Sequence, residues 1–342
     1  MKNKKKKIII NLVIFILLML LLFYFVFKNI DLKKLILSVE KANFGYLGLG
    51  IFIMACSLFF EGVNIHICLN SFGYKRSILN CLKYAGVGFF FSGITPSSTG
   101  GQPMQIYYMY KDKVPVSCAT ILLILILTGY IVATLILTVL GLFIDAHFIS
   151  TIGYVKIFIY LGIIINFVGF ILCMILMFSK KLSTKFGNFI IKILNKFKYK
   201  KVEQVKEKIN NEISIYQNTA EHIKNKKWLI LICIFLNLLE LIGKFSIPYF
   251  VYRAFGLNEF GYVSLVLLES LLFIATAILP SPGAMGVSEG GFLILFKRIF
   301  KGNYLTEAML LNRFISFYLF IFLIGIFLFI EKFLKTNKRK KC

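Results

Sequence analysis

The sequence predicts an all-α polytopic membrane protein, and three observations lead to this fold class. Hydrophobic residues make up 58% of the 342-residue chain, whereas charged residues make up only 16%. The apolar residues fall in blocks of about 20 or more, the length at which a helix crosses the hydrocarbon core of a bilayer. Lysines supply most of the net charge of +25 and flank these blocks. Because lipid offers the backbone no hydrogen-bond partner, each block is expected to be helical.

Seven blocks are predicted to cross the membrane as complete helices. They are Ile8–Phe27, Tyr46–Leu69, Val116–Ile144, Tyr154–Phe178, Trp228–Tyr252, Tyr262–Leu279 and Arg313–Ile330. The first block follows a run of lysines, as a signal peptide does, but it is longer than a signal sequence and no small-residue cleavage site follows it. We therefore expect it to remain as an uncleaved first span.

Two further apolar segments are interrupted by glycine, proline and serine. The first contains GITPSSTGGQPMQ at Gly93–Gln105, and the second contains PSPGAMGVSEGG at Pro280–Gly291. A straight helix does not propagate through such sequences. At membrane depth, irregular backbone persists only where it is buried in protein or faces a water-filled cavity. We expect a re-entrant loop at the first segment and a broken helix at the second.

Positively charged residues predict that both chain ends and the long connector lie in the cytoplasm. The connector 179–227 holds thirteen lysines and four glutamates, and the segment after Ile330 holds five lysines, one arginine and one glutamate. Four predicted spans precede the connector and three follow it, so one more crossing is needed after it. We expect Phe292–Phe300 to supply this crossing and to bring the total to about eight, whereas the first interrupted segment re-enters without crossing.

These features divide the chain into four parts. They are an N-terminal membrane half 1–178 with a re-entrant loop at 93–105, a basic cytoplasmic connector 179–227, a C-terminal membrane half 228–335 with a broken element at 280–291, and a basic tail 336–342. In the connector, apolar residues recur at helical spacing between lysines, which is typical of an amphipathic helix on the membrane surface, although an ordinary solvated loop is the alternative. These residues are Phe186, Phe189, Ile190, Ile193, Leu194 and Phe197.

The two membrane halves resemble each other weakly. Each has a span that carries a glutamate, Glu61 or Glu240, followed by an interrupted segment. Paired interrupted segments in corresponding positions are typical of transporters built from inverted repeats, whose substrate site lies at the repeat interface. The sequence thus favours an inverted repeat with a polar site between the halves.

Ionisable residues inside the apolar segments are functional candidates, because a charge in lipid is costly. Glu240 and Lys244 are four residues apart, so they either neutralise each other for insertion or line a cavity as a pair. Glu289 either caps a helix start or binds substrate, and Arg313 is either an interfacial anchor or a phosphate ligand. The candidates are Glu61, His66, Glu240, Lys244, Glu269, Glu289 and Arg313, of which His66 is expected to be a hydrogen-bonded packing residue.

A polar turn in the first interrupted segment is the best candidate for binding an anion. Its hydroxyl groups, its amide and its two adjacent glycines, which expose backbone N–H groups, suit the phosphate of a lipid. Its pairing with Pro280–Gly291 at membrane depth strengthens this interpretation. The candidate residues are Thr95, Ser97, Ser98, Gly100, Gly101, Gln102 and Gln105.

The motifs of several enzyme classes are absent from the sequence. There is no Walker A, HExxH or GxSxG motif. The three histidines form no metal-binding pattern, and the seven cysteines include no CxxC pair, so we expect neither a metal, a cofactor nor a disulfide framework. The aromatic residues lie in the apolar blocks and not among the lysines, which argues against binding of nucleic acid.

Two segments closely resemble the signature regions of the lysylphosphatidylglycerol synthase transmembrane family. They are GITPSSTGGQPMQIYYMYK at Gly93–Lys111 and LPSPGAMGVSEGGF at Leu279–Phe292, and the resemblance extends from about Lys7 to Lys335. The family includes the membrane region of the multiple peptide resistance factor. That region is thought to move lysyl-phosphatidylglycerol between leaflets, while a separate cytosolic domain makes this lipid from lysyl-tRNA. The resemblance implies helix hairpins at both signature segments and a stand-alone form without the synthase domain.

We therefore expect a flippase-like lipid translocase in the bacterial plasma membrane, for an anionic or aminoacylated phospholipid such as lysyl-phosphatidylglycerol or for a related carrier lipid. The polar turn would contact phosphate, and Glu61, Glu240 and Glu269 would meet a cationic headgroup or a coupling proton. One alternative is a phosphatidylglycerol lysyltransferase that acts with a synthase domain in trans and confers resistance to cationic peptides. Another is a non-transporting scaffold for envelope-lipid enzymes. The expected partners are membrane phospholipids, a separate lipid-synthesising enzyme and a second copy of the chain.

Overall fold

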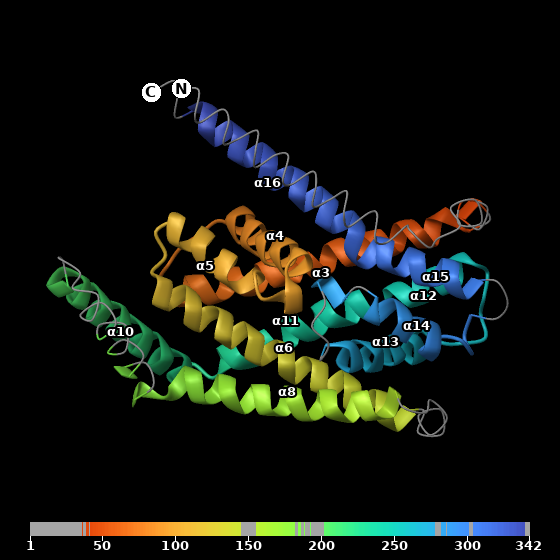
Figure 1. The fold of residues 1–342 in the computed structure, drawn as a ribbon, viewed down its shortest axis with the longest axis horizontal. Coiled ribbons are helices and arrows are strands. Elements are labelled where there is room, and N and C mark those ends of the chain that lie inside the picture. Colours follow the sequence, from red (N-terminus) through yellow and green to blue (C-terminus); the bar gives the residue numbers. More distant parts are fainter. Residues whose placement is uncertain are drawn as a thin grey trace.

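A computed structural model describes residues 42–144, 155–181, 202–277, 282–284, 286–300 and 304–338, with isolated positions between 36 and 40 and between 184 and 192. Every regular element in these ranges is a helix (Figure 1). The predicted first span, Ile8–Phe27, lies outside the described residues. So does almost all of the amphipathic stretch predicted at 186–197.

Each half of the chain contains two short helices joined by a 3₁₀ turn. The first half contains α3 (Phe44–Ser71), α4 (Ile78–Ile94), the 3₁₀ turn η1 (Pro96–Ser98), α5 (Gly101–Lys111), α6 (Val116–Ile144) and α8 (Val155–Phe178). After α10 (Val202–Asn225), the second half contains α11 (Trp228–Phe245), α12 (Ile247–Ala254), α13 (Tyr262–Thr276), the 3₁₀ turn η2 (Pro282–Ala284), α14 (Val287–Leu295), α15 (Tyr304–Arg313), the π-helical η3 (Phe314–Tyr318) and α16 (Leu319–Lys338). In each half, this pair of short helices follows a long apolar segment, Phe44–Ser71 in the first half and Trp228–Ala254 in the second.

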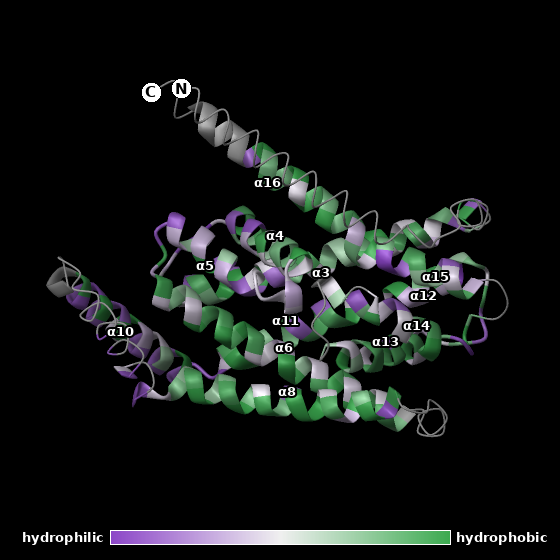
Figure 2. Cartoon of the chain, in the orientation of Figure 1, coloured by the Kyte–Doolittle hydropathy of each residue, from purple (hydrophilic) through white to green (hydrophobic). Residues whose placement is uncertain are grey.

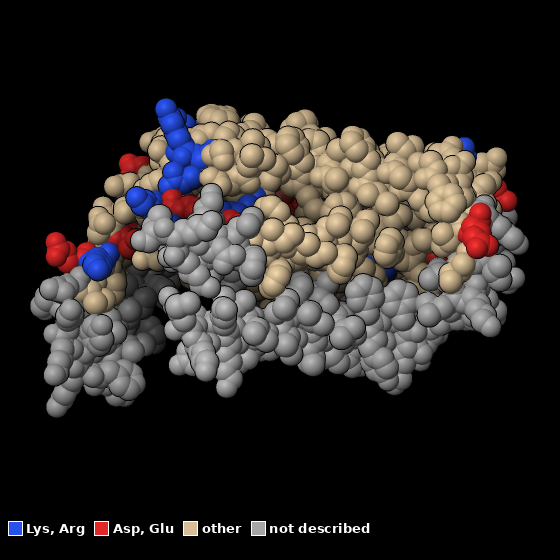
Figure 3. Space-filling model, turned by 90° about the horizontal axis from the view of Figure 1, so that it is seen from above, with Lys and Arg blue, Asp and Glu red and all other residues tan. Residues whose placement is uncertain are grey.

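Five helices in the described residues are long and apolar enough to cross a membrane. They are Phe44–Ser71, Val116–Phe143, Val155–Phe178, Trp228–Ala254 and Tyr304–Glu331, which confirms the multi-pass helical architecture. Their outward faces are apolar, while polar residues concentrate at the helix ends and on α10 (Figure 2). From above, charged residues gather toward the two ends of the molecule and leave a mostly uncharged band between them (Figure 3).

The first interrupted segment forms a helical hairpin, in which α4 and α5 pack against each other on either side of η1. The limbs run in opposite directions, because Tyr84 near the start of α4 bonds to Asp112 at the end of α5. Glycine allows this close approach: a Cβ atom at Gly101 would lie 2.0 Å from Ser92 Oγ. The expected re-entrant shape is therefore present.

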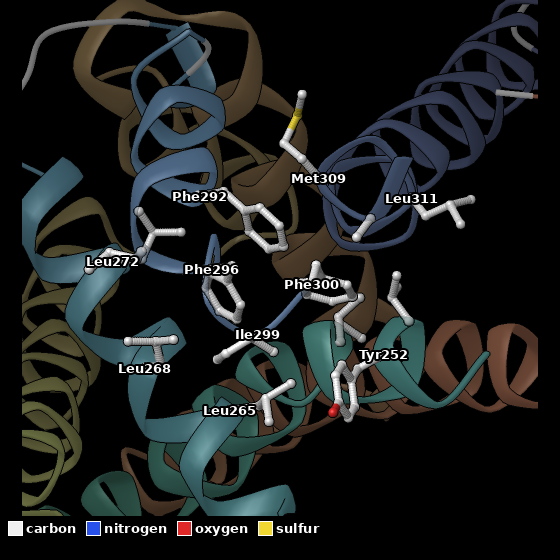
Figure 4. Packing of buried hydrophobic residues seen from close by; sticks show 14 of the residues in the cluster. Tyr252, Leu265, Leu268, Leu272, Phe292, Phe296, Ile299, Phe300, Met309 and Leu311 are labelled. Carbon is white, nitrogen blue, oxygen red and sulfur yellow. The ribbon is translucent and has the colours of Figure 1, made fainter. Parts of the chain in front are cut away.

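The second interrupted segment also forms a hairpin, from α13 and α14. Along α13, Leu272, Leu268 and Leu265 face successive aromatic and apolar residues of α14 and the turn after it (Figure 4). The rings of Phe292 and Phe296 stack at 4.2 Å between centroids. The two limbs thus form a compact apolar unit.

The second hairpin corrects the predicted crossings at Tyr262–Leu279 and Phe292–Phe300. Helix α13 has 15 residues, and at about 1.5 Å per residue it is roughly 22 Å long, too short to cross the ~30 Å apolar core. Helix α14 has only 9 residues and ends at Leu295. The limbs return on each other instead of crossing in turn, because the backbone at Gly283 has a φ of +55° and breaks the helical path.

The tips of the two hairpins, η1 and η2, pack against each other. Both turns begin with proline and continue in the left-handed region, with φ of 51° at Ser97 and 55° at Gly283. The ring of Phe317 lies beside both hairpins, since a Cβ atom at Gly283 would be 2.2 Å from it and one at Gly93 would be 3.1 Å away. Segments 186 residues apart in the chain (96 to 282) therefore adopt the same conformation and meet.

Helix α10 attaches the connector to the helix bundle. Glu212 accepts a hydrogen bond from the N–H of Ser117 at 2.9 Å, which caps the start of α6. Tyr216 donates to the carbonyl of Leu176 on α8 at 2.8 Å, and Ile223 is fully buried. The amphipathic helix that the structure describes thus lies after the stretch predicted at 186–197.

Candidate functional site

A group of buried polar side chains lies between helices of both halves, and we call it the central polar cluster. It consists of Glu61 on α3, Gln105 on α5, Tyr130 on α6, and Glu240 and Lys244 on α11. Helices α3, α6 and α11 pack closely on one another. The first hairpin therefore brings its Gln105 to the packed centre of the bundle.

Glu240 and Lys244 form an ion pair at the core of this cluster. The distance from Lys244 Nζ to Glu240 Oε1 is 2.5 Å, and the two side chains are only 19% and 3% exposed, respectively. The ammonium group also lies 5.8 Å from the centre of the Tyr130 ring, a distance at which the face of the ring attracts a cation. The spacing of four residues thus produces the predicted pair, and the pair is buried inside the protein.

Glu61 is the second carboxylate of the cluster and has no ammonium partner of its own. Its Oε1 accepts a hydrogen bond from Gln105 Nε2 at 3.1 Å. The same nitrogen donates to the carbonyl oxygen of Tyr84 at 3.2 Å, which fixes the amide in place. Because Glu61 is within electrostatic reach of both Glu240 and Lys244, the ionised cluster holds two carboxylates and one ammonium group.

A second group, the hairpin polar cluster, joins the second hairpin to α15 and η3. Arg313 Nε donates to Glu289 Oε1 at 2.9 Å, and its Nη2 donates to the carbonyl oxygen of Gly283 at 2.7 Å. Tyr318 donates to the same carboxylate oxygen at 3.2 Å. The guanidinium carbon also lies 4.8 Å from the centre of the Phe317 ring. Arg313 is thus bound inside the fold, to the carboxylate of Glu289 and to the backbone of η2.

Glu289 caps the start of α14, as one of its two predicted roles required. Its Oε2 accepts from the backbone N–H of Gly286 at 2.6 Å and from Ser288 Oγ at 3.1 Å. Together with Arg313 and Tyr318, these donors occupy both carboxylate oxygens. Glu289 therefore serves to hold the second hairpin together.

The predicted Glu269 on α13, together with Asn312 on α15, differs from the other candidates because each side chain has one oxygen atom without a hydrogen-bond partner. Glu269 Oε2 and Asn312 Oδ1 are both shielded from solvent and make no hydrogen bond in the described structure. Asn312 is only 3% exposed. Among the predicted intramembrane acids, Glu269 is thus the one with an unsatisfied oxygen.

The predicted polar turn divides into a structural part and an exposed part. Thr95 Oγ1 donates to the carbonyl of Phe91 at 2.6 Å and accepts from the N–H of Gly100 at 2.9 Å, so its hydroxyl group serves the turn itself. Gly101 is buried against α4. Ser97, Ser98 and Gln102 are exposed at the tip and remain the side chains that a ligand can reach.

One buried network was not among the predicted site residues. Lys83 on α4 lies 3.2 Å from Asp112 and 3.5 Å from Glu331 on α16, and its side chain is only 8% exposed. Tyr84 donates to the same Asp112 oxygen at 2.6 Å. The network connects the first hairpin to the last helix of the second half. A lysine within the apolar stretch Ile78–Ile94 was the signal that could have revealed it.

The described side chains do not form the residue groups that bind metal ions in proteins. Within that part of the chain, no group of three or more histidine, cysteine, aspartate or glutamate residues is arranged to hold a metal ion. The described cysteines are free thiols, as expected, and most are buried. Cys68 and Cys233 come within 3.5 Å of each other between α3 and α11.

Comparison with known proteins agrees with this architecture. The family described as the lysylphosphatidylglycerol synthase TM region matches residues 8–325. A relative from Archaeoglobus fulgidus, named UPF0104 membrane protein, is 23% identical over 300 residues, which cover 87% of this chain and 90% of the relative. The family match includes both hairpins and both polar clusters. The chain is therefore a multi-pass membrane protein that belongs to the lysylphosphatidylglycerol synthase transmembrane-region family.

Proposed function

We propose that this protein is a lipid translocase of the plasma membrane, which moves an anionic or aminoacylated phospholipid, such as lysyl-phosphatidylglycerol, or a related carrier lipid between leaflets. The observation that carries the proposal is the meeting of two broken-helix hairpins, one from each half, at η1 and η2. In transporters, such elements form the substrate site at the interface of two repeats. The buried charges beside the hairpins supply the polar path that a headgroup needs.

The central polar cluster suits a headgroup that carries an amine. With Glu61, Glu240 and Lys244 all ionised, the cluster has one carboxylate more than it has ammonium groups. A substrate ammonium group near Glu61 would balance this charge, and the Tyr130 ring already faces a cation. The lysyl group of an aminoacylated phospholipid presents such an ammonium group.

The exposed part of the polar turn suits the phosphate of the same lipid. Ser97, Ser98 and Gln102 offer hydroxyl and amide donors at the tip of the first hairpin. The acyl chains would remain in the bilayer against apolar outer surfaces such as that of α8, where Ile164 is 57% and Phe167 56% exposed. The headgroup would thus cross through protein while the tails stay in lipid.

The proposed membrane topology follows from the lysine distribution. If both termini are cytoplasmic, α3 and the α11–α12 pair cross the membrane in opposite directions. The first hairpin then enters from the cytoplasmic side, the second enters from the external side, and their tips meet within the membrane. Such an inverted arrangement allows the site to open alternately to each leaflet.

A leaflet-resolved assay in proteoliposomes tests the proposal. Fluorescent phosphatidylglycerol and fluorescent lysyl-phosphatidylglycerol are reconstituted with the purified full chain, and a membrane-impermeant quencher reports the fraction in the outer leaflet over time. We expect faster exchange of the lysyl lipid than in protein-free vesicles. No acceleration of either lipid, or of a polyprenyl phosphate tested next, would overturn the proposal.

A parallel reaction separates transport from synthesis. The same vesicles, with unlabelled phosphatidylglycerol, are incubated with lysyl-tRNA, and lysyl-lipid is measured by mass spectrometry. We expect no product from this chain alone. Formation of lysyl-phosphatidylglycerol would instead favour the lysyltransferase alternative.

A further inference from the structure

The pair Glu269–Asn312 is a buried polar site to which the proposed headgroup path assigns no task. Glu269 is on the first limb of the second hairpin, and Asn312 is on α15, immediately before the π-helical turn η3. The Asn312 side chain lies beside the Glu269 carboxyl group and interacts with it. Even so, Glu269 Oε2 and Asn312 Oδ1 have no partner. Two acceptor atoms thus lie unsatisfied at a helix–helix contact.

An ionised Glu269 fits this environment poorly. A carboxylate has only acceptor oxygens, so it leaves its own Oε2 unpaired and offers nothing to Asn312 Oδ1. A buried acceptor without a donor loses its hydration and gains no bond in return. Addition of one proton to Glu269 changes the state of both unpaired oxygens, because the carboxyl group then has an O–H donor.

A protonated Glu269 is complementary to the Asn312 carboxamide. A carboxylic acid and a carboxamide pair through two hydrogen bonds, in which the O–H donates to the amide oxygen and the N–H₂ donates to the acid carbonyl. The two ends of an asparagine amide are told apart by their hydrogen-bond partners, so such a pair also fixes which end of Asn312 is the oxygen. One proton therefore satisfies both of the unpaired atoms that the structure shows.

The charged residues around Glu269 are already bound elsewhere or form no ion pair with it in the described structure. Arg313 is the charge that acts on it, and this guanidinium is already bound to Glu289 and to the Gly283 carbonyl. The other helices packed against α13 are α6, α8, α11, α12 and α14. Their described charged residues are Lys156 at the start of α8, the paired Glu240 and Lys244, Arg253 and Glu289, and α15 itself also carries the buried Glu307. None of these forms an ion pair with Glu269 within the part of the chain that the structure describes.

We infer that Glu269 and Asn312 form a proton-binding site, whose occupancy controls how the second hairpin is attached to α15 and thereby couples lipid translocation to a proton gradient. This inference rests on the proposed translocase function. A metal cation is a poor occupant, because hard cations take about six or more oxygen ligands and the pair offers only two unpaired oxygens. Loss of the proton removes the hydrogen bond from the Glu269 O–H to Asn312 Oδ1 and leaves only the amide N–H to join α13 and α15. The link from α14 and η2 to Arg313 remains.

The first test needs no lipid transport. Infrared difference spectra of the purified full chain in lipid nanodiscs are recorded during a pH titration, and the carbonyl band of protonated carboxyl groups is followed. We expect Glu269→Gln to remove one such band that titrates in the wild type. The matched control is Glu259→Gln, which replaces an exposed glutamate just before α13 and is expected to leave the band unchanged. An unchanged band in Glu269→Gln would overturn the inference.

The second test measures coupling in proteoliposomes with fluorescent lysyl-phosphatidylglycerol. We expect an imposed pH gradient to accelerate exchange by the wild type and by Glu269→Asp, which retains a titratable carboxyl group. Glu269→Gln is expected to lose the whole response to the gradient. A sodium gradient at constant pH is the alternative arm, and a response to sodium but not to pH would overturn the proton assignment.

The two proposals fail in different ways. If the wild type moves lipid equally fast with and without a pH gradient, the proton site is wrong and the translocase remains. If the wild type moves no lipid while the infrared band of Glu269 titrates, the proton site stands and the translocase function is wrong. Detergent size-exclusion profiles of every variant verify that each has folded.

Discussion

Glu61, Glu240 and Lys244 place two carboxylates around one ammonium group inside the helix bundle. Glu240 and Lys244 satisfy each other at 2.5 Å, whereas Glu61 accepts a hydrogen bond from the neutral Gln105 amide. A charge buried in low-dielectric surroundings is favourable only with a partner. Glu61 is thus the member of the cluster that a cationic substrate would satisfy.

Replacement of Glu61 by glutamine tests this role. In Glu61→Gln the side-chain oxygen still accepts from Gln105, but the excess negative charge is gone. Because a hydrogen bond to a charged group contributes about 1.5–3 kcal/mol, we expect exchange of lysyl-phosphatidylglycerol to slow by about tenfold or more. The leaflet assay measures the rate, and unlysylated phosphatidylglycerol should be affected less.

The control for this substitution is Glu221→Gln, on the exposed face of α10. It removes the same charge away from the cluster and should leave exchange unchanged. Membrane insertion and yield of both variants are expected to match the wild type. An unaltered rate in Glu61→Gln would remove Glu61 from the substrate path.

Residue patterns predicted the local part of the site and missed the long-range part. The pair Glu240–Lys244 follows from a spacing of four on one helix, so the sequence revealed it directly. The bond between Gln105 and Glu61 joins helices 44 residues apart, and Lys83 reaches Glu331 over 248 residues. No local pattern encodes such contacts, because they depend on how the helices assemble.

At the scale of elements, the hairpins show where hydropathy alone is insufficient. Helix α13 is apolar, and its sequence was interpreted as a span, yet it is a hairpin limb of 15 residues. The hydropathy of an apolar stretch that is buried in protein is the same as that of one that faces lipid. The lysine distribution requires an even number of crossings after the connector. Because Tyr262–Leu279 was counted as a complete span, an additional crossing had to be predicted. The proline and glycine residues of η2, by contrast, correctly marked the break.

Close contact within the first hairpin depends on glycine. A Cβ atom at Gly101 would lie 2.0 Å from Ser92 Oγ and 2.8 Å from the backbone oxygen of Gly88, so α5 would have to move away from α4. We expect Gly101→Ala to destabilise the protein by about 1–3 kcal/mol, as is usual for overpacking. Thermal unfolding in detergent measures the change.

The matched control is Gly48→Ala on α3, where a Cβ atom would have no neighbour within 4 Å. Because alanine favours helix more than glycine does, this variant should be neutral or slightly more stable. Equal effects of the two substitutions would mean that the hairpin limbs do not pack as described.

Attachment of α10 should depend on pH through His222. Its Nε2 atom is 3.0 Å from Ser71 Oγ on α3, and its ring meets that of Phe72 edge-on at 5.9 Å. Partial burial and the nearby Lys226 lower the pKa of His222 below its usual 6.5. A lowered pKa means that folding favours the neutral ring, so this contribution to stability is present above pH 6.5 and is lost as the pH falls below it.

Hydrogen exchange of the α10 backbone measures this effect. We expect faster exchange at pH 5 than at pH 7.5, after correction for the intrinsic pH dependence of amide exchange. In His222→Gln, which does not titrate and still carries a hydrogen-bonding side chain, the difference should disappear. A difference that persists in this variant would assign the pH dependence to another group.

At the scale of the whole molecule, the two halves are joined by several closely packed helix pairs and by polar contacts. Helices α3 and α11, which occupy corresponding places in the halves, pack very closely: a Cβ atom at Gly243 would be 2.2 Å from Ser57 Oγ. The second hairpin is also closely packed on the opposite half, because α13 lies against α6 and α8 and a Cβ atom at Gly162 would be 2.4 Å from the backbone oxygen of Ile274. The first hairpin contacts the opposite half through Lys83–Glu331, α16 and the turns η1 and η2. Polar contacts exchange partners more readily than packed backbones do, so the first hairpin is the part expected to move.

Two native cysteines allow this division between scaffold and moving parts to be tested. Cys68 Sγ on α3 and Cys233 Sγ on α11 are 3.5 Å apart, and both residues are fully buried. Oxidation with copper phenanthroline would remove two protons and two electrons from the thiols and join the helices covalently. With a protease site inserted in the connector, the halves of the cross-linked protein should migrate together on a non-reducing gel and separate in Cys233→Ser.

The cross-linked protein is expected to move lipid at nearly the wild-type rate, because a bond between two parts of one scaffold restrains no required motion. Loss of transport on oxidation, restored by a reductant and absent in Cys233→Ser, would show instead that α3 and α11 move apart during transport. That result would shift the moving boundary from the first hairpin to the contact between the two halves. The rate of lipid exchange in the oxidised protein thus distinguishes hairpin movement from movement of whole halves.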